Sequence, residues 1–153
     1  MDNKKKLLLL ILSSVLLFSF DRISKLHKLY TNNYSINKGT AFGFFSNFEY
    51  TPLVLILIAL VVSFFCLFFY FRKKGFSYLH IALLLLFSGS VSNLVDRIIY
   101  RYVIDFITLN FLPIPAFNLA DVFNFFGLLL LLVFILKNEN RERSNGGRTG
   151  SSM

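Results

Sequence analysis

Two long runs without a charged residue constrain what this chain can fold into more than any other feature of its sequence. Pro52–Phe71 and Phe76–Val95 are 20 residues each and contain no Asp, Glu, Lys or Arg. A helix of 20 residues is ~30 Å long, which matches the hydrocarbon core of a bilayer. The chain of 153 residues is 56% hydrophobic and has 20 Phe, which is more apolar than a soluble domain of this size. These features predict a membrane protein.

Two shorter apolar runs, Leu7–Phe20 and Val122–Leu136, reach membrane-spanning length when their flanks are included. The first run follows three lysines and so also looks like a secretory signal peptide, but it ends in Phe-Asp-Arg instead of the small residues of a cleavage site. Apolar residues continue at helical spacing to Leu29, which favours an uncleaved first helix. The predicted fold is an all-α polytopic membrane protein with four transmembrane helices, at about 6–28, 52–71, 76–96 and 116–136.

The positions of Lys and Arg predict the orientation of these helices. Ten of the 16 basic residues fall on the side of the two termini and the middle loop, and six fall on the other side. Since cytoplasmic loops carry the excess of Lys and Arg, both termini are expected in the cytoplasm. Residues 1–136 then form a single membrane-embedded domain, and 137–153, which lack an apolar pattern, form a disordered cytoplasmic tail. The net charge of +8 follows from this topology and from contact with anionic membrane lipid, so no nucleic-acid partner is expected.

Cysteine and histidine exclude several kinds of chemistry. The single Cys66 lies inside the second predicted helix, where a small buried residue is expected. His27 and His80 fall at opposite membrane faces and cannot share a metal ion. We therefore expect neither a metal site nor a cofactor.

Acidic residues gather at or beyond the outer ends of the predicted helices. Five of the eight acids have this position: Asp21, Glu49, Asp96, Asp105 and Asp121. Pro113 and Pro115 prevent one continuous helix between Asp105 and Asp121, so the chain can double back and bring these two carboxylates together. Two close carboxylates share one proton, and such a pair can take a proton from water and give one to a carbonyl oxygen. This is the arrangement of aspartic proteases.

Simpler interpretations of the same residues remain open. Asp121 is also explained as a carboxylate in the first turn of a helix that begins near Pro115 and Asn118. Arg97 is expected to pair with its neighbour Asp96.

The first outer loop contains YSINKGTAFGFF, whose alternation and glycines predict short extended strands with a turn at Lys38–Gly39. A plain β-turn accounts for Asn37 and Gly39. Similarly, Asp21 and Lys25 fit an exposed i,i+4 pair of little energetic value.

Five motifs occur in a fixed order relative to the four predicted helices: DRISK at 21–25, INKGTAFGF at 36–44, NLVDR at 93–97, VIDF at 103–106 and FNLAD at 117–121. In these motifs the chain resembles the type II (lipoprotein) signal peptidases. The resemblance implies an aspartic endopeptidase of the bacterial cytoplasmic (inner) membrane, with its active site at the extracytoplasmic face. Its substrates are diacylglyceryl-modified prolipoproteins, cut before the lipidated cysteine, and globomycin-type compounds inhibit it.

The resemblance also implies roles for individual residues. The catalytic pair falls on Asp105 and Asp121. Positions that hold substrate or globomycin fall on Asn37, Gly39, Asn93, Arg97 and Asn118. Asp21, Lys25 and Asp96 are supporting residues.

Four positions depart from the usual family pattern. Members usually have glycine where Ser92 and Arg101 stand, alanine where Thr40 stands, and serine where Val122 stands. No departure removes a carboxylate or an amide named above. Ser92 nevertheless adds a side chain beside Asn93, where glycine would let another segment come closer to the backbone.

Three other functions fit less well. A serine–lysine protease would have to use Ser24 and Lys25, whose side chains diverge on a helix because they are adjacent. A proton-coupled transporter predicts polar residues near the membrane midplane and repeated halves, and neither is visible. A purely structural subunit leaves the gathered acids unexplained.

Overall fold

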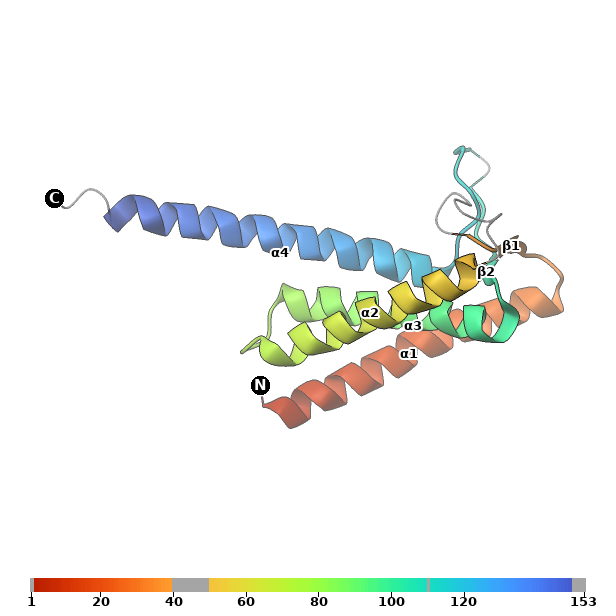
Figure 1. The fold of residues 1–153 in the computed structure, drawn as a ribbon, viewed down its shortest axis with the longest axis horizontal. Helices are drawn as coiled ribbons and strands as arrows, with labels where there is room; N and C mark the ends of the chain where they lie inside the picture. Colours follow the sequence, from red (N-terminus) through yellow and green to blue (C-terminus); the bar gives the residue numbers. More distant parts are fainter. Residues whose placement is uncertain (1, 40–49, 110, 150–153) are drawn as a thin grey trace.

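The computed structural model describes residues 2–39, 50–109 and 111–149. Within these ranges, four helices carry the fold (Figure 1): α1 (Asn3–Tyr30), α2 (Thr51–Arg72), α3 (Tyr78–Tyr100) and α4 (Leu119–Thr149). Two short strands, β1 (Ser35–Asn37) and β2 (Val103–Asp105), pair at one end of the helices. The N-terminus and the connection between α2 and α3 lie at the opposite end.

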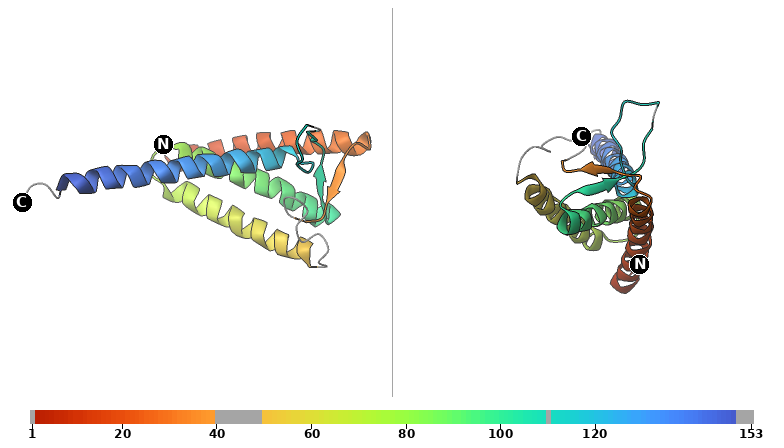
Figure 2. Two further views of the ribbon diagram at one scale, coloured as in Figure 1. Left: turned by 90° about the horizontal axis from the view of Figure 1, so that it is seen from above. Right: turned by 90° about the vertical axis from the view of Figure 1, so that its right-hand side faces the viewer.

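All four helices are long and apolar enough to cross a membrane, which confirms the predicted spans. Among them α3 is central: 56% of its apolar stretch is buried, against 17% or less for the other three. Figure 2 shows the other helices packed around it. The outer helices turn many large apolar side chains outward, as expected of helices that face lipid.

The fourth helix differs most from the sequence prediction. It begins at Leu119 and runs to Thr149, whereas the sequence predicts a start near 116 and a disordered tail after 136. The prediction relied on the missing apolar pattern, but adding a residue to an existing helix costs less than starting a helix, and Lys, Glu and Arg in the first part of the extension are good helix formers. In Figure 1 this extension projects past the ends of the other helices.

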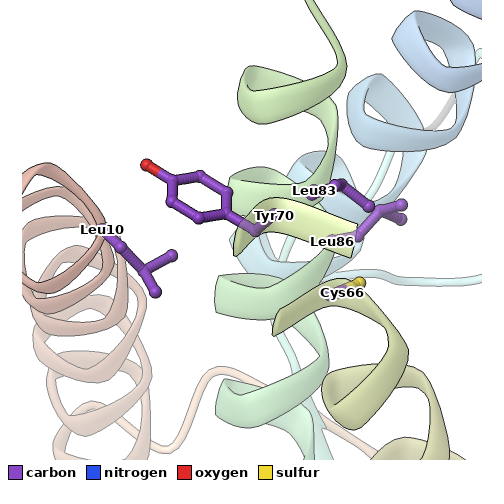
Figure 3. Packing of buried hydrophobic residues seen from close by; sticks show 5 residues of the cluster. All are labelled: Leu10, Cys66, Tyr70, Leu83 and Leu86. Atoms are coloured by element: carbon purple, nitrogen blue, oxygen red, sulfur yellow. The ribbon is translucent and has the colours of Figure 1, made fainter. Parts of the chain in front are cut away.

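A small apolar core lies between α1, α2 and α3 in the half of the bundle away from the strands. Figure 3 shows its five members, Leu10, Cys66, Tyr70, Leu83 and Leu86. Cys66 is 5% exposed, so its predicted packing role is confirmed. The Tyr70 hydroxyl donates a hydrogen bond to a main-chain carbonyl of α1 at 3.2 Å, which ties this end of the bundle together.

Two glycines allow α3 and α4 to approach each other closely. A Cβ atom on Gly89 would lie 2.4 Å from the carbonyl oxygen of Ala120, and one on Gly127 would lie 2.8 Å from the Leu86 side chain. Small residues are the usual means of close helix contact in membranes. The first turn of α4 is therefore held against the middle of α3.

The strands bring distant polar residues to one place. β1 and β2 are antiparallel with Asn37 opposite Val103, so Asn37 and Asp105 lie diagonally on the same face. A further bridge joins Ile107 and Phe117 and carries the chain back from β2 to the start of α4. The predicted reversal between β2 and the fourth helix is thus present, and residues 40–49 of the predicted first outer loop lie outside the described ranges.

Arg101 ends α3 in the left-handed region, with φ of 66°. This conformation costs an L-residue about 1–2 kcal/mol, while glycine adopts it freely but loses about 0.5–1 kcal/mol of chain entropy. We expect Arg101→Gly to raise the free energy of unfolding by about 0.5–1 kcal/mol, the difference between these costs. Thermal unfolding in detergent measures the change. Arg101→Ala is the control: it removes the same charge but keeps the strain, and equal stabilisation by both variants would refute the argument.

Candidate active site

Asp105 ends β2 and is only 2% exposed. Asn37 donates a hydrogen bond from Nδ2 to its Oδ2 at 3.0 Å. Asn118 donates from Nδ2 to its Oδ1 at 2.7 Å. Each carboxyl oxygen is therefore held by an amide from a different segment, which leaves the Asp105 side chain little freedom.

Asp121 is the third residue of α4 and forms a reciprocal capping pair with Asn118. The backbone N–H of Asn118 donates to Asp121 Oδ2 at 3.1 Å, and the backbone N–H of Asp121 donates to Asn118 Oδ1 at 3.0 Å. This capping box satisfies two N–H groups at the start of the helix. The helix-start interpretation of Asp121 is correct, but its other oxygen, Oδ1, accepts a hydrogen bond from Asn93 at 2.8 Å.

Asn118 connects the two aspartates. It is fully buried, donates to Asp105 through Nδ2 and caps Asp121 through Oδ1. The Asp105 carboxyl group is thus held by the side chain of Asn118, and the Asp121 carboxyl group by the backbone N–H of the same residue. The structure thus brings Asp105 and Asp121 together, as the proline-induced reversal predicts.

Asn93 is oriented by three hydrogen bonds. Its Oδ1 accepts from Lys25 Nζ at 3.1 Å and from Asn118 Nδ2 at 3.2 Å. Its Nδ2 is consequently turned toward Asp121. Within the part of the chain that the structure describes, Lys25 therefore acts on the site through Asn93 and donates to neither Asp105 nor Asp121.

Lys25 and its partners form a buried ion network, not the exposed pair that spacing suggests. Its Nζ lies 2.7 Å from Asp21 and 2.8 Å from Asp96, and the side chains of all three are 0% exposed. Arg22 also forms an ion pair with Asp96. The expectation of an exposed pair is wrong because α3 supplies a second carboxylate and covers both partners.

Arg97 does not pair with Asp96, in contrast to the prediction. The two are adjacent on α3 and point about 100° apart, so Asp96 meets α1 while Arg97 turns toward the strands. The Arg97 guanidinium donates to the carbonyl oxygens of Asn93 and Gly39, both at 3.3 Å. The N–H of Gly39 in turn donates to Asn37 Oδ1 at 3.0 Å, so Asn37 both forms a turn and holds Asp105.

These side chains surround one cavity of about 590 Å³. Its polar wall consists of Asn37, Asn93, Arg97, Asp105 and Asp121. The lining also includes three residues of α4 that the sequence analysis did not single out: Asn124, Phe125 and Leu128. They follow Asp121 at i+3, i+4 and i+7, and this helical spacing is the signal that could have placed them on the same face.

Burial raises the pKa of Asp105 from 3.8 to about 6, and the negative charge of Asp121 adds to this effect. The hydrogen bonds from Asn37 and Asn118 and the charge of Lys25 act in the opposite direction. Two carboxylates at one site favour a state with a single shared proton.

Within the described residues, no group of three or more His, Cys, Asp or Glu side chains is arranged to hold a metal ion. His80 is 1% exposed and accepts a hydrogen bond from the Ser77 N–H at 3.2 Å. It is therefore a buried residue that caps the start of α3.

Comparison with known proteins agrees with this geometry. The family model described as "Signal peptidase (SPase) II" matches residues 3–137. The chain belongs to the signal peptidase II family. The lipoprotein signal peptidase of Clostridium tetani (strain Massachusetts / E88) is 38% identical over 113 residues, covering 72% of this chain and 71% of that protein. The lipoprotein signal peptidase of Clostridioides difficile (strain 630) is 27% identical over 151 residues, covering 89% of this chain and 100% of that protein.

The fold is also that of a solved bacterial membrane enzyme. That structure, determined in meso at 2.3 Å resolution, superposes with a TM-score of 0.77 at 24% sequence identity, covering 86% of this chain and 90% of that chain. The similarity supports the four-helix architecture.

Ser92 stands where members of the signal peptidase II family usually have glycine, and the structure explains how it is accommodated. Its side chain is fully buried and its hydroxyl donates to Asp21 Oδ2 at 2.5 Å. The other oxygen of Asp21 accepts the backbone N–H of Ala120 at 3.1 Å. The hydroxyl thus joins the buried ion network and leaves Asn93 in hydrogen-bond contact with Asp121.

Proposed function

We propose that this protein is an aspartic endopeptidase that removes the signal peptide from diacylglyceryl-modified prolipoproteins, with Asp105 and Asp121 as the catalytic pair. The observation that carries the assignment is the placement of both carboxyl groups around Asn118, at the wall of one cavity. The raised pKa of Asp105 supports a single shared proton. Membership of the signal peptidase II family supports the substrate class.

The reaction follows from a pair that holds one proton. The ionised carboxylate takes a proton from a water molecule, whose oxygen attacks the carbonyl carbon of the peptide bond before the lipidated cysteine. The protonated carboxyl gives its proton to the carbonyl oxygen, and a tetrahedral diol forms. The diol then collapses: the C–N bond breaks, the cysteine nitrogen takes a proton and leaves as an amine, and the signal peptide ends in a new carboxyl group.

Neighbouring polar groups position the substrate in this mechanism. Asn93 and Asn118 hold the two carboxyl groups in place. Arg97 has two long hydrogen bonds of 3.3 Å, and a guanidinium carries five N–H donors. We assign Arg97 and Asn37 to substrate carbonyl oxygens near the scissile bond, where fixed donors stabilise developing charge.

An apolar path leads away from the aspartates. The main cavity shares Leu128 with a second, wholly apolar cavity of about 480 Å³, which is lined by residues of α2, α3 and α4. A signal helix and two acyl chains are apolar and approach within the membrane plane. This path therefore supports a substrate that enters from lipid, and not a soluble peptide.

The proposed location is the cytoplasmic membrane of a bacterium, with the strands and the aspartates at the outer face and both termini inside. The distribution of Lys and Arg supports this orientation. Globomycin-type inhibitors are assigned to the main cavity. Anionic lipid is assigned to the basic inner ends of the helices.

Cleavage of a lipidated substrate in detergent tests the proposed function. We expect the purified protein to shorten a diacylglyceryl prolipoprotein by the length of its signal peptide and to leave the unlipidated precursor uncut. Globomycin should inhibit the reaction. The two substrates are compared in a gel-shift assay, where each serves as the other's control. Equal cleavage of both substrates, or cleavage of neither, would contradict the proposal.

The raised pKa of Asp105 predicts the alkaline side of the activity profile. We expect kcat/KM to decrease as the pH rises above about 6, because Asp105, with a pKa of about 6, loses the shared proton there. On the acid side activity should decrease as the second carboxyl is protonated, giving a bell-shaped profile with two macroscopic pKa values.

The same shift predicts a pH dependence of stability. A carboxyl whose pKa rises on folding, here from 3.8 to about 6, stabilises the fold fully below its unfolded value and loses this contribution as the pH rises through 6. Melting temperatures between pH 4 and 7 measure it, and Asp105→Asn should flatten the curve. An equally steep curve for that variant would assign the effect to another group.

A further inference from the structure

Asn124 is a polar residue on the cavity wall that the proposed mechanism does not use. It lies on α4 one turn beyond Asp121, on the same face, and lines the main cavity. Its Oδ1 atom is buried and has no hydrogen-bond partner. Among the described residues, neither atom of its amide forms a hydrogen bond with another side chain or with the backbone.

A buried amide oxygen without a hydrogen-bond partner is costly inside a membrane-spanning helix. Leucine, which has nearly the same size and shape, would carry no such cost. A polar residue at such a position calls for an explanation, and its Nδ2 group, which also has no partner among the described residues, is available to bind a ligand in the cavity.

The packing around Asn124 determines which part of the amide is available. The Oδ1 atom is wedged between α3 and α4 at Gly89, where an added Cβ atom would lie 2.5 Å from it. With the oxygen turned toward α3, the Nδ2 group remains for the cavity. An Nδ2 group is a hydrogen-bond donor, so the complementary ligand atom is an acceptor.

We propose that Asn124 is a substrate-selecting residue whose Nδ2 donates a hydrogen bond to a carbonyl oxygen of the bound prolipoprotein. The inference rests on the proposed function and adds a contact to it. Asn124 lies three residues beyond Asp121, about 4.5 Å deeper in the membrane. A substrate cut at the aspartates presents carbonyl oxygens there from two sources, the peptide backbone of its signal segment and the ester groups of its diacylglyceryl chain.

Two lipopeptides that differ only in the lipid linkage distinguish these sources. One carries diacylglyceryl with ester carbonyls, and the other carries a dialkyl ether analogue without them. Binding is measured in detergent by fluorescence titration in an Asp105→Asn background, so that turnover does not interfere. Wild-type cleavage of the ester lipopeptide is measured separately, and its absence would count against the proposed function while the binding comparison still tests Asn124.

We expect Asn124→Leu to weaken binding of the ester lipopeptide about 3- to 10-fold, the value of one hydrogen bond. If the ester carbonyl is the acceptor, Asn124 should discriminate between the two lipopeptides and the Leu variant should not. If a peptide carbonyl is the acceptor, the substitution should weaken both equally. Unchanged binding of both lipopeptides would overturn the proposal.

Stability measurements separate this role from a structural one. Since the Asn124 amide is unsatisfied in the free protein, Asn124→Leu should not lower the melting temperature. Asn124→Ala provides a second test if the larger side chain disturbs the contact with Gly89. Asn140→Leu, at an exposed position near the far end of the same helix, is the control and should leave binding unchanged. A loss of binding that tracks a loss of stability in both Asn124 variants would also overturn the proposal.

Discussion

Asp105→Asn and Asp121→Asn are each expected to stop cleavage of a diacylated prolipoprotein. Asparagine keeps the size and polarity of aspartate but cannot hold or transfer the proton that the pair shares. We expect kcat to decrease by roughly 10²–10⁴-fold, the usual contribution of general acid–base catalysis. The double variant should be scarcely worse than either single one, because residues that act as a unit are not additive. Single-turnover assays of purified variants measure these values.

The control for these substitutions is Asp2→Asn. Asp2 is exposed, and its side chain caps the start of α1 at the opposite end of the bundle. Asparagine caps a helix about as well as aspartate, so this variant should retain full activity. Substantial cleavage by Asp121→Asn would leave that residue with its capping role alone, and the aspartic mechanism would be wrong.

Lys25→Met is expected to lower the free energy of unfolding by about 3–5 kcal/mol, since removal of one member of a buried ion pair leaves a buried charge uncompensated. Lys25 contacts the carboxylates of Asp21 and Asp96, both fully buried. The variant also loses the hydrogen bond that orients Asn93. Thermal and denaturant unfolding in detergent measure the first effect, and kcat of the protein that remains folded measures the second.

Two further variants test whether the buried ion network causes the loss of stability in Lys25→Met. Lys28→Met removes the same charge from a partly exposed position on the same helix, and we expect a change within about 0.5 kcal/mol. Adding Asp21→Asn to Lys25→Met removes one of the stranded charges and should restore part of the lost stability. If Lys25→Met proves as mild as Lys28→Met, the network contributes nothing to the fold.

The sequence predicts the helices and the approach of Asp105 to Asp121 because both depend on local rules. Long uncharged runs identify membrane spans without knowledge of their neighbours. Pro113 and Pro115 require a break in the chain, and the break allows Asp105 and Asp121 to meet. The capping role of Asn118 is also a local pattern, since it involves residues only three positions apart.

The remaining contacts depend on how the helices pack, which spacing alone does not determine. Asp21 and Lys25 look like an ordinary surface pair until α3 covers them with Asp96. Asp96 and Arg97 look like partners because they are adjacent, yet they point in different directions on the helix. Asn124 looks like an isolated polar residue in an apolar run, and only the cavity shows what it faces.

The hydrogen bond from the backbone N–H of Ala120 to Asp21 joins α4 to α1, across 99 positions of the chain. A ribosome delivers these helices to the membrane in order, so α1 is inserted long before α4 exists. During that interval one oxygen of Asp21 lacks the partner that it has in the finished protein. The fourth helix therefore completes this network: when α4 enters, it brings the backbone donor that Asp21 lacks and the carboxylate at position 121 in the same turn. A chain interrupted before α4 contains neither, so in the proposed mechanism it has no catalytic pair.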